Sequence, residues 1–257
     1  MDVVEGIDRL RSDQGPLVVV VGVFDGMHRG HAYLLGQLVD AAGMRDARPA
    51  VITFDHHPDE VITGRAPALL MDPEDRVDLL AAAGVAVTVV QHFDATLRQT
   101  PYDAFVERIR ARVDLRGFVM TPDAAFGFER RGTPDALAVL GRRDGFDVVV
   151  VPPFTIDGQD VRSSAIRAAI GDGDLRAAER LLGRPVTISG TIEPGRRAAD
   201  GLTALDPVMP LAMPPDGDYA ALIEGDPRAV RIAAGRAYVV GAETAGRVTA
   251  QLVAVVG

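Results

Sequence analysis

The chain has 257 residues, 47% of them hydrophobic and 25% charged, a composition that is typical of globular proteins and excludes intrinsic disorder. Its formal net charge of −9 argues against a protein that binds nucleic acid through a basic surface. The chain contains no cysteine and no lysine, which excludes disulfides, thiolate-bound metals, a P-loop lysine and a Schiff base. Phosphate chemistry would therefore depend on arginine, histidine, backbone N–H groups, helix termini or a metal ion.

Up to about residue 155, short β-branched runs alternate with longer segments of helical periodicity, a pattern that predicts βαβ units and an open, doubly wound parallel sheet. The expected strands are Leu17–Val23, Ala50–Phe54, Val85–Val90, Gly117–Thr121 and Phe146–Val151. The expected helices are His31–Ala42, Glu74–Ala83, Tyr102–Val113 and Pro134–Arg142. Ligands of such sheets bind beyond the carboxyl ends of the strands, so functional residues are expected just after Val23, Phe54 and Thr121.

A second pattern begins after Gly158. Two helices are expected at Ser163–Ile170 and Asp174–Leu182, followed by short strands separated by turn residues. These strands are Val186–Ile192, Tyr219–Glu224, Ala229–Ala233, Ala237–Val240 and Val248–Val256. We therefore expect an α/β domain over residues 1–185 and a small β-barrel-like domain over residues 186–257.

The longest apolar run near the N-terminus, Leu17–Val21, is too short to span a bilayer, and no charged leader precedes it. A cytoplasmic protein without a membrane partner is expected.

The most informative segment is Gly22–His31, where the first strand is expected to end and the first helix to begin. Its glycines allow close approach of a ligand, and a helix N-terminus presents unpaired N–H groups and a positive dipole end. His28 and His31, three residues apart, would share one helical face and could both hydrogen-bond a phosphate. The alternative is that they are ordinary surface or cap residues, but the coincidence of strand, glycines and helix favours the anion site.

A second candidate segment, Val161–Arg167, combines two hydroxyls at a helix start with an arginine one turn later. Ser163, Ser164 and Arg167 could together hold triphosphate oxygens. Taken alone, the same pattern also describes a serine N-cap beside a solvated arginine.

The segment G-x-F-D-G-x-H-x-G-H resembles the signature of the FAD synthetase branch of the HxGH nucleotidyltransferases, and Val161–Arg167 resembles the second signature of that family. The resemblance implies a Rossmann-like FMN adenylyltransferase domain over residues 1–185, with ATP and FMN as substrates and Mg²⁺ as cofactor. It implies catalytic roles for His28, His31 and Arg167. It implies nucleotide binding by Gly22, Phe24, Asp25, Gly26, Gly30, Ser163 and Ser164.

The acceptor side is expected in two segments that also resemble the family. Thr53–Pro58 is similar to T-F-x-x-H-P, and Val119–Phe128 is similar to V-G-x-[DN]-F-x-F-G. The resemblance implies acceptor binding by Phe54, His57, Pro58, Asp123 and Phe126. Asp123 is alternatively a turn residue after Pro122.

Three departures from the family pattern keep other readings open. Thr121 replaces a glycine, Ala124 an aromatic residue and Arg162 a serine. One alternative is a nucleotidyltransferase for a different phosphate-bearing acceptor or nucleotide. Another is a catalytically silent flavin- or nucleotide-binding protein.

The C-terminal domain resembles a truncated, degenerate riboflavin kinase. Leu202 and Leu205 stand at the proline and asparagine positions of the G-x-P-T-A-N element, and Thr249 stands where the catalytic glutamate would be. A threonine cannot serve as a general base near neutral pH, so loss of kinase activity is expected. The alternative is that Glu243 is a displaced catalytic carboxylate.

Overall fold

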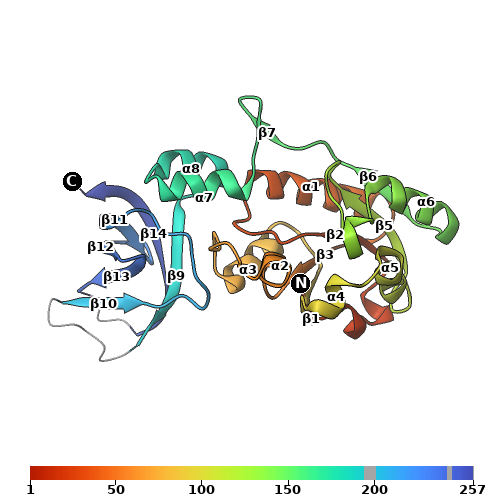
Figure 1. The fold of residues 1–257 in the computed structure, drawn as a ribbon, viewed down its shortest axis with the longest axis horizontal. Coiled ribbons are helices and arrows are strands. Elements are labelled where there is room, and N and C mark those ends of the chain that lie inside the picture. The colour runs from red at the N-terminus through yellow and green to blue at the C-terminus, as the bar shows by residue number, and fades with distance from the viewer. Residues whose placement is uncertain (194–200, 242–244, 257) are drawn as a thin grey trace. The chain divides into compact units, whose positions relative to one another are not determined.

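The structure is a computed structural model that describes residues 1–193, 201–241 and 245–256 (Figure 1). By its internal contacts the chain divides into two units. Unit 1 comprises residues 1–24, 30–67 and 77–160, and unit 2 comprises residues 25–29, 68–76 and 161–257.

Unit 1 is built on a six-stranded parallel sheet in the order β1-β4-β3-β2-β5-β6. The strands are β1 (Asp2–Glu5), β2 (Leu17–Val21), β3 (Arg48–Phe54), β4 (Val87–Gln91), β5 (Leu115–Met120) and β6 (Asp147–Val150). After β2 the chain adds β3 and β4 on one side, and β5 and β6 then extend the sheet on the other side of β2. The strand order therefore reverses between β2 and β5, where doubly wound sheets bind ligands.

Helices connect the strands of the first 160 residues (Figure 1). They are α1 (Arg29–Gly43), α2 (Pro58–Thr63), α3 (Pro73–Ala82), α4 (Ala95–Arg98), α5 (Tyr102–Arg110) and α6 (Pro134–Asp144). Local sequence fixes several of their ends: Asp94 and Thr133 accept N-cap hydrogen bonds, and Gly145 ends α6 in the left-handed conformation. A two-stranded hairpin, β7 (Thr155–Ile156) and β8 (Gln159–Asp160), follows β6.

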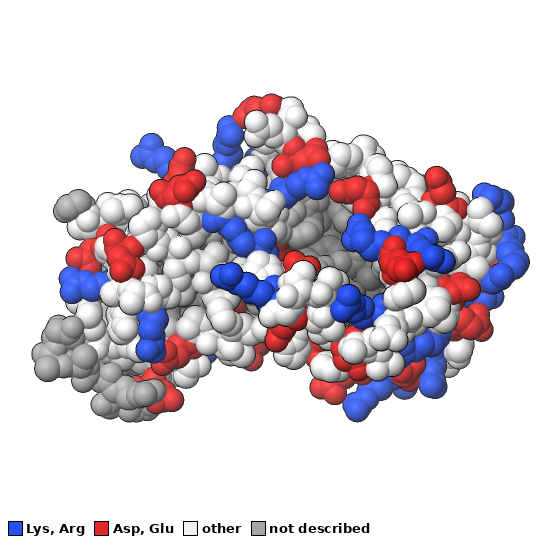
Figure 2. All heavy atoms as spheres, viewed as in Figure 1, with Lys and Arg blue, Asp and Glu red and all other residues white. Residues whose placement is uncertain are grey.

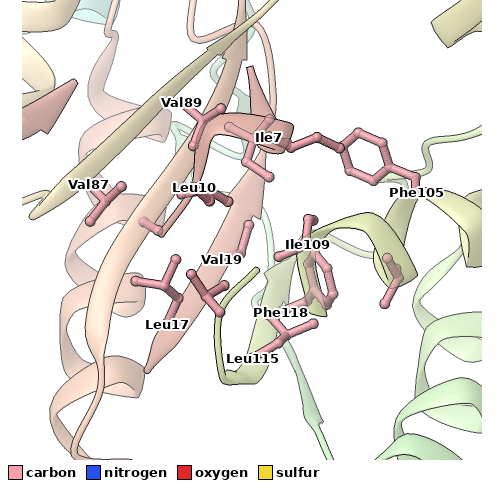
Figure 3. Packing of buried hydrophobic residues seen from close by; sticks show 14 of the residues in the cluster. Ile7, Leu10, Leu17, Val19, Val87, Val89, Phe105, Ile109, Leu115 and Phe118 are labelled. Atoms are coloured by element: carbon pink, nitrogen blue, oxygen red, sulfur yellow. The ribbon is translucent and has the colours of Figure 1, made fainter. Parts of the chain in front are cut away.

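One face of the parallel sheet carries the main core of unit 1. Leu17 and Val19 of β2 pack there with Phe105 and Ile109 of α5, as Figure 3 shows. The alternate positions of β2, Val18 and Val20, are buried as well. A strand buried on both faces reads as a continuous apolar run, which explains the V-V-V-V sequence of β2.

Unit 2 contains α7 (Ser163–Gly171), α8 (Leu175–Leu182) and a six-stranded antiparallel sheet in the order β10-β13-β12-β11-β14-β9. Its strands are β9 (Val186–Ile192), β10 (Leu202–Leu205), β11 (Gly217–Ile223), β12 (Asp226–Ala233), β13 (Arg236–Val240) and β14 (Gly246–Val256). The sheet closes on itself because Thr191 and Asp206 exchange two backbone hydrogen bonds, of 2.8 and 3.0 Å. Ile166, Ile170 and Leu182 of the two helices join the core of the barrel.

The expected fold class is confirmed: a doubly wound parallel sheet is followed by a small β-barrel. Four strands were not predicted: the short edge strand β1, the two-residue strands β7 and β8 of the hairpin, and β10, whose sequence was interpreted only as part of a motif. By contacts α7 and α8 group with the barrel, whereas the domain boundary between residues 185 and 186 stays a prediction.

Candidate active site

The loop that follows β2 has an unusual backbone. Phe24, Gly26 and Met27 all have positive φ values, of 54°, 82° and 39°. For Phe24 and Met27 this conformation is strained, and both side chains are buried. Strain of this kind is retained where the surrounding structure holds the backbone, and it is concentrated at functional sites.

Within unit 1, the start of the loop is fixed by contacts with its own sheet. The Thr53 hydroxyl donates to the carbonyl of Val23 at 3.0 Å. The ring of Phe24 lies 5.0 Å from the ring of His31, centroid to centroid. A Cβ on Gly22 would lie 3.1 Å from the Phe24 ring, so glycine leaves room for that aromatic side chain. Phe24 and His31 are therefore brought together, while nucleotide binding by Phe24 and a catalytic role of His31 stay predictions.

Within unit 2, hydrogen bonds to Asp25 hold the loop in place. Its carboxylate accepts from the Leu70 backbone N–H at 2.8 Å and from Arg167 Nη2 at 2.6 Å. The Ser163 hydroxyl donates to the Asp25 carbonyl at 3.0 Å. Asp25 is 4% exposed, whereas 21% of the Arg167 side chain is exposed, so a buried carboxylate pairs with a partly buried guanidinium, and both carboxylate oxygens accept hydrogen bonds.

Gly26 is required by the same packing. Its φ of +82° is unfavourable for other residues, and a Cβ there would lie 2.7 Å from Leu70 Cδ1.

His28 lies in a buried, electropositive setting and is only 5% exposed. Burial lowers the pKa of its imidazole to about 4, with Arg184 and Arg167 lowering it further and a hydrogen bond to its own backbone acting in the opposite direction. His28 is therefore neutral at neutral pH, so it can offer a phosphate a hydrogen bond but not a full positive charge.

Arg184 is the site residue that sequence reasoning missed. Its Nη1 atom is buried and has no hydrogen-bond partner among the residues that the structure describes. Burial lowers the pKa of this guanidinium, while Asp75 and Asp25 raise it, yet an arginine stays charged. Arg184 lies between the expected helix Asp174–Leu182 and the expected strand Val186–Ile192, where the sequence predicts only a domain boundary.

Helix α7 begins beside Asp25, and its N-cap side chain makes no capping hydrogen bond. This N-cap residue is Arg162, which is exposed. Ser164 is exposed in the first turn. The departure at Arg162 thus removes a capping hydroxyl and leaves the first N–H groups of a nine-residue helix uncapped by that side chain.

The first acceptor segment follows β3 in unit 1. Phe54 is buried, and its ring packs edge-on against Phe93 with 5.2 Å between centroids. His57 is the N-cap of α2, where its Nδ1 accepts from the Asp59 backbone N–H at 3.2 Å, and Pro58 is the first residue of that helix. Local structure thus accounts for all three residues, and acceptor binding by them stays a prediction.

The second acceptor segment follows β5. The Thr121 hydroxyl donates to the Asp123 carboxylate at 2.8 Å, and the Ala124 N–H donates to the Thr121 carbonyl at 3.1 Å, which forms a turn. Phe126 lies 5.4 Å from Phe105 and 5.7 Å from Phe118, ring to ring. Asp123 is thus a turn residue and Phe126 borders the core, and their acceptor roles also stay predictions.

Two barrel residues that are predicted to stand at kinase positions, Leu205 and Thr249, make structural contacts. Leu205 is 1% exposed in the barrel core. The Thr249 hydroxyl is 2.8 Å from the Ser189 hydroxyl, which donates to Asp75. Glu243 lies outside the described residues.

Acidic and basic side chains are interspersed over the face of the molecule drawn in Figure 2. Among the described residues, every helix is too short or too polar to cross a membrane.

The fold and this loop place the chain among the α/β proteins that bind ligands at the carboxyl ends of a doubly wound sheet. The sequence model of the FAD synthetase family matches residues 10–165, and the chain belongs to that family.

Two relatives are named bifunctional riboflavin kinase/FMN adenylyltransferase. The one from Haemophilus influenzae is 32% identical over 199 residues, which cover 77% of this chain and 65% of the relative. The one from Escherichia coli K12 is 30% identical over 231 residues, which cover 88% of this chain and 74% of the relative. This chain thus spans about two thirds to three quarters of their lengths.

A crystal structure described as a macrolide-efflux protein from Streptococcus pneumoniae has a TM-score of 0.78 to this chain. The match covers 99% of this chain and 90% of the other at 21% identity, and it supports the fold alone.

Proposed function

We propose that the chain transfers the adenylyl group of ATP to FMN and releases pyrophosphate and FAD. An oxygen of the FMN phosphate attacks the α-phosphorus of ATP in line and forms a new P–O–P linkage. The bond between the α-phosphorus and the oxygen that bridges it to the β-phosphate breaks, and that oxygen leaves with pyrophosphate. The FMN phosphate is already ionised, so no side-chain base or nucleophile is needed. The observation that carries the proposal is the strained loop before the H-x-G-H motif, which the Asp25–Arg167 ion pair holds in place. The chain also belongs to the FAD synthetase family.

In this mechanism the protein positions the phosphates and neutralises the charge that develops on them. His28, being neutral, donates an imidazole N–H to the α-phosphate, and His31 supplies a second donor. The N-terminus of α7, which the Arg162 side chain does not cap, binds the β- and γ-phosphates together with Ser163 and Ser164.

Arg167 contributes without leaving Asp25. Its Nε donates to the Ala68 carbonyl at 2.8 Å and its Nη2 to Asp25, and a guanidinium has five N–H groups. Three N–H groups remain for the triphosphate, on a side chain whose orientation is already fixed. Arg184 adds a buried N–H group that lacks an acceptor, which a nucleotide phosphate would supply.

Mg²⁺ enters as part of the substrate, bound to the nucleotide phosphates. Asp25 is not assigned as a metal ligand, because its buried carboxylate is already paired with the Arg167 guanidinium, which offsets its charge. Mg²⁺ is commonly bound through phosphates with few protein carboxylates, and when bound it offsets phosphate charge.

FMN adenylylation is tested by incubating the protein with FMN, ATP and MgCl₂, separating FMN from FAD by chromatography and measuring pyrophosphate. FAD and pyrophosphate should form in equal amounts, and Arg184→Gln should reduce both far more than Arg143→Gln, which replaces an arginine whose side chain is 72% exposed. Pyrophosphate release only with another phosphate monoester or nucleotide would support the alternative acceptor that Thr121 and Ala124 suggest. Ligand-induced melting shifts without turnover would support a silent binding protein.

We further propose that the barrel does not phosphorylate riboflavin. Leu205 fills the core where the kinase would place an asparagine, and Thr249 hydrogen-bonds Ser189 where it would place a general base. Protein supplied with riboflavin, ATP and Mg²⁺ should therefore form no FMN. FMN formation that is lost in Glu243→Gln would show that Glu243 is the catalytic carboxylate and that the chain is bifunctional.

A further inference from the structure

Three of the five histidines of the chain lie outside the H-x-G-H motif, and two of these gather around one carboxylate in unit 1. Asp55 and His56 directly follow β3, and His92 directly follows β4. β3 and β4 are neighbouring parallel strands, with Phe54 opposite Gln91 in the register. Both chain segments therefore leave the sheet at the same edge, which brings the three side chains together.

The three side chains are arranged as a ligand set. His92 Nδ1 lies 2.6 Å from Asp55 Oδ2, and His56 Nδ1 lies 3.2 Å from Asp55 Oδ1. One ligand atom from each residue falls within 4.8 Å of the other two. Tetrahedral ligands with metal bonds of about 2.0–2.1 Å lie roughly 3.3 Å apart, so small side-chain movements would close the set around an ion.

The backbone already holds the carboxylate in place. Asp55 Oδ1 accepts from the N–H groups of His56 at 2.8 Å and Phe93 at 3.1 Å. Hydrogen bonds of this kind orient a metal-binding carboxylate and are part of a built site. The two imidazoles are the more exposed partners, with 46% and 65% of the side chains of His56 and His92 accessible, so an ion can enter from solvent.

We propose that Asp55, His56 and His92 bind a divalent transition metal ion, with Zn²⁺ as the preferred ion. Two imidazoles and one carboxylate suit zinc, whereas Mg²⁺ and Ca²⁺ prefer sets made of oxygen. Three protein ligands leave a fourth position for water or an anionic ligand. The competing explanation is a simple ion pair between Asp55 and His92, which has no need of His56.

The test uses the full-length protein, stripped with a chelator and kept free of nucleotide and flavin, so that it is independent of the proposed adenylyl transfer. Zinc is titrated by calorimetry, and Co²⁺ is added separately to detect the visible absorption of a tetrahedral site. One zinc ion should bind per chain, and His56→Gln and His92→Gln should each weaken binding at least about tenfold. The neighbouring His57→Gln serves as the matched control, because His57 Nδ1 already accepts from the Asp59 N–H.

Circular dichroism of each variant separates loss of a ligand from loss of fold. The proposal is overturned if zinc does not bind, if His56→Gln leaves the affinity unchanged, or if His57→Gln weakens it as much as the other two substitutions.

Discussion

Protonation of His28 should destabilise the protein in mildly acidic solution. The imidazole pKa is about 4 in the folded state and 6.5 as an ordinary value, because burial and two arginines disfavour the cation. Between these values the unfolded state binds the proton more readily, so stability falls as the pH is lowered from about 6.5 toward 4. The full difference corresponds to about 3 kcal/mol, and since His28 is 5% exposed no allowance for solvent screening is needed.

Most of this loss of stability should be measurable at pH values above those at which carboxylates titrate. Between pH 7 and pH 5 the His28 contribution to the free energy of unfolding should decrease by about 2 kcal/mol. Urea unfolding at several pH values, compared between wild type and His28→Gln, isolates this contribution because the other four histidines are common to both proteins. The variant should have a flatter dependence on pH.

The pKa itself is measurable by NMR of the imidazole nitrogens. His28 should titrate near pH 4, and Arg184→Gln should raise that value because one of the neighbouring positive charges is removed. A His28 that titrates near 6.5 in the folded protein, or a variant with the pH slope of wild type, would refute the buried, electropositive setting assigned to this residue.

Three further predictions concern the same loop. His31→Ala should leave the fold intact and lower turnover by at least about a hundredfold, as expected for loss of a transition-state donor, and normal FAD formation would remove His31 from the mechanism. Arg167→Ala should raise the KM for ATP more than that for FMN, which steady-state kinetics would measure. The same substitution should destabilise the protein by roughly 3–5 kcal/mol, because Asp25 becomes a buried charge without its partner, and urea unfolding would measure this loss. Gly26→Ala should lower the free energy of unfolding by about 1–3 kcal/mol, because its Cβ would clash with Leu70. Gly36 is exposed within α1 and has open space around it, so Gly36→Ala should raise the free energy of unfolding by about 0.5–1 kcal/mol. Equal melting temperatures for the two variants would contradict the packing described.

The long periodic segments of this chain were predictable because their patterns are set locally. The strand Val186–Ile192 is observed with its predicted bounds, and the strand predicted at Leu17–Val23 is observed at Leu17–Val21, two residues shorter at its C-terminal end. β1 was missed because it has four residues at a sheet edge and only two apolar side chains, so its strand character depends on pairing with β4. β10 is similar: L-T-A-L contains too few residues for a pattern, and its partner β13 lies more than thirty residues later.

The site was predictable in part for the same reason. The H-x-G-H segment combines strand, glycines and helix within ten residues, so its position needs no tertiary information. Arg184 and the cluster of Asp55, His56 and His92 are different, since each depends on contacts between segments distant in sequence. The sequence offered one signal for the cluster, histidines just after two predicted parallel strands, because such strand ends meet at one edge of the sheet.

The absence of lysine connects the composition to the site. A lysine ammonium is a point charge, whereas the planar guanidinium of Arg167 bonds Ala68 and Asp25 and still has N–H groups for a ligand. If the triphosphate instead drew Arg167 away, Asp25 would be left as a buried carboxylate without its cation, at a cost of several kcal/mol. Binding is therefore most favourable when Arg167 keeps its protein partners and adds the phosphate to them. Under the proposed function, the ion pair that stabilises the loop would also hold the Arg167 donor in place before the nucleotide binds, which would reduce the reorganisation required in the transition state.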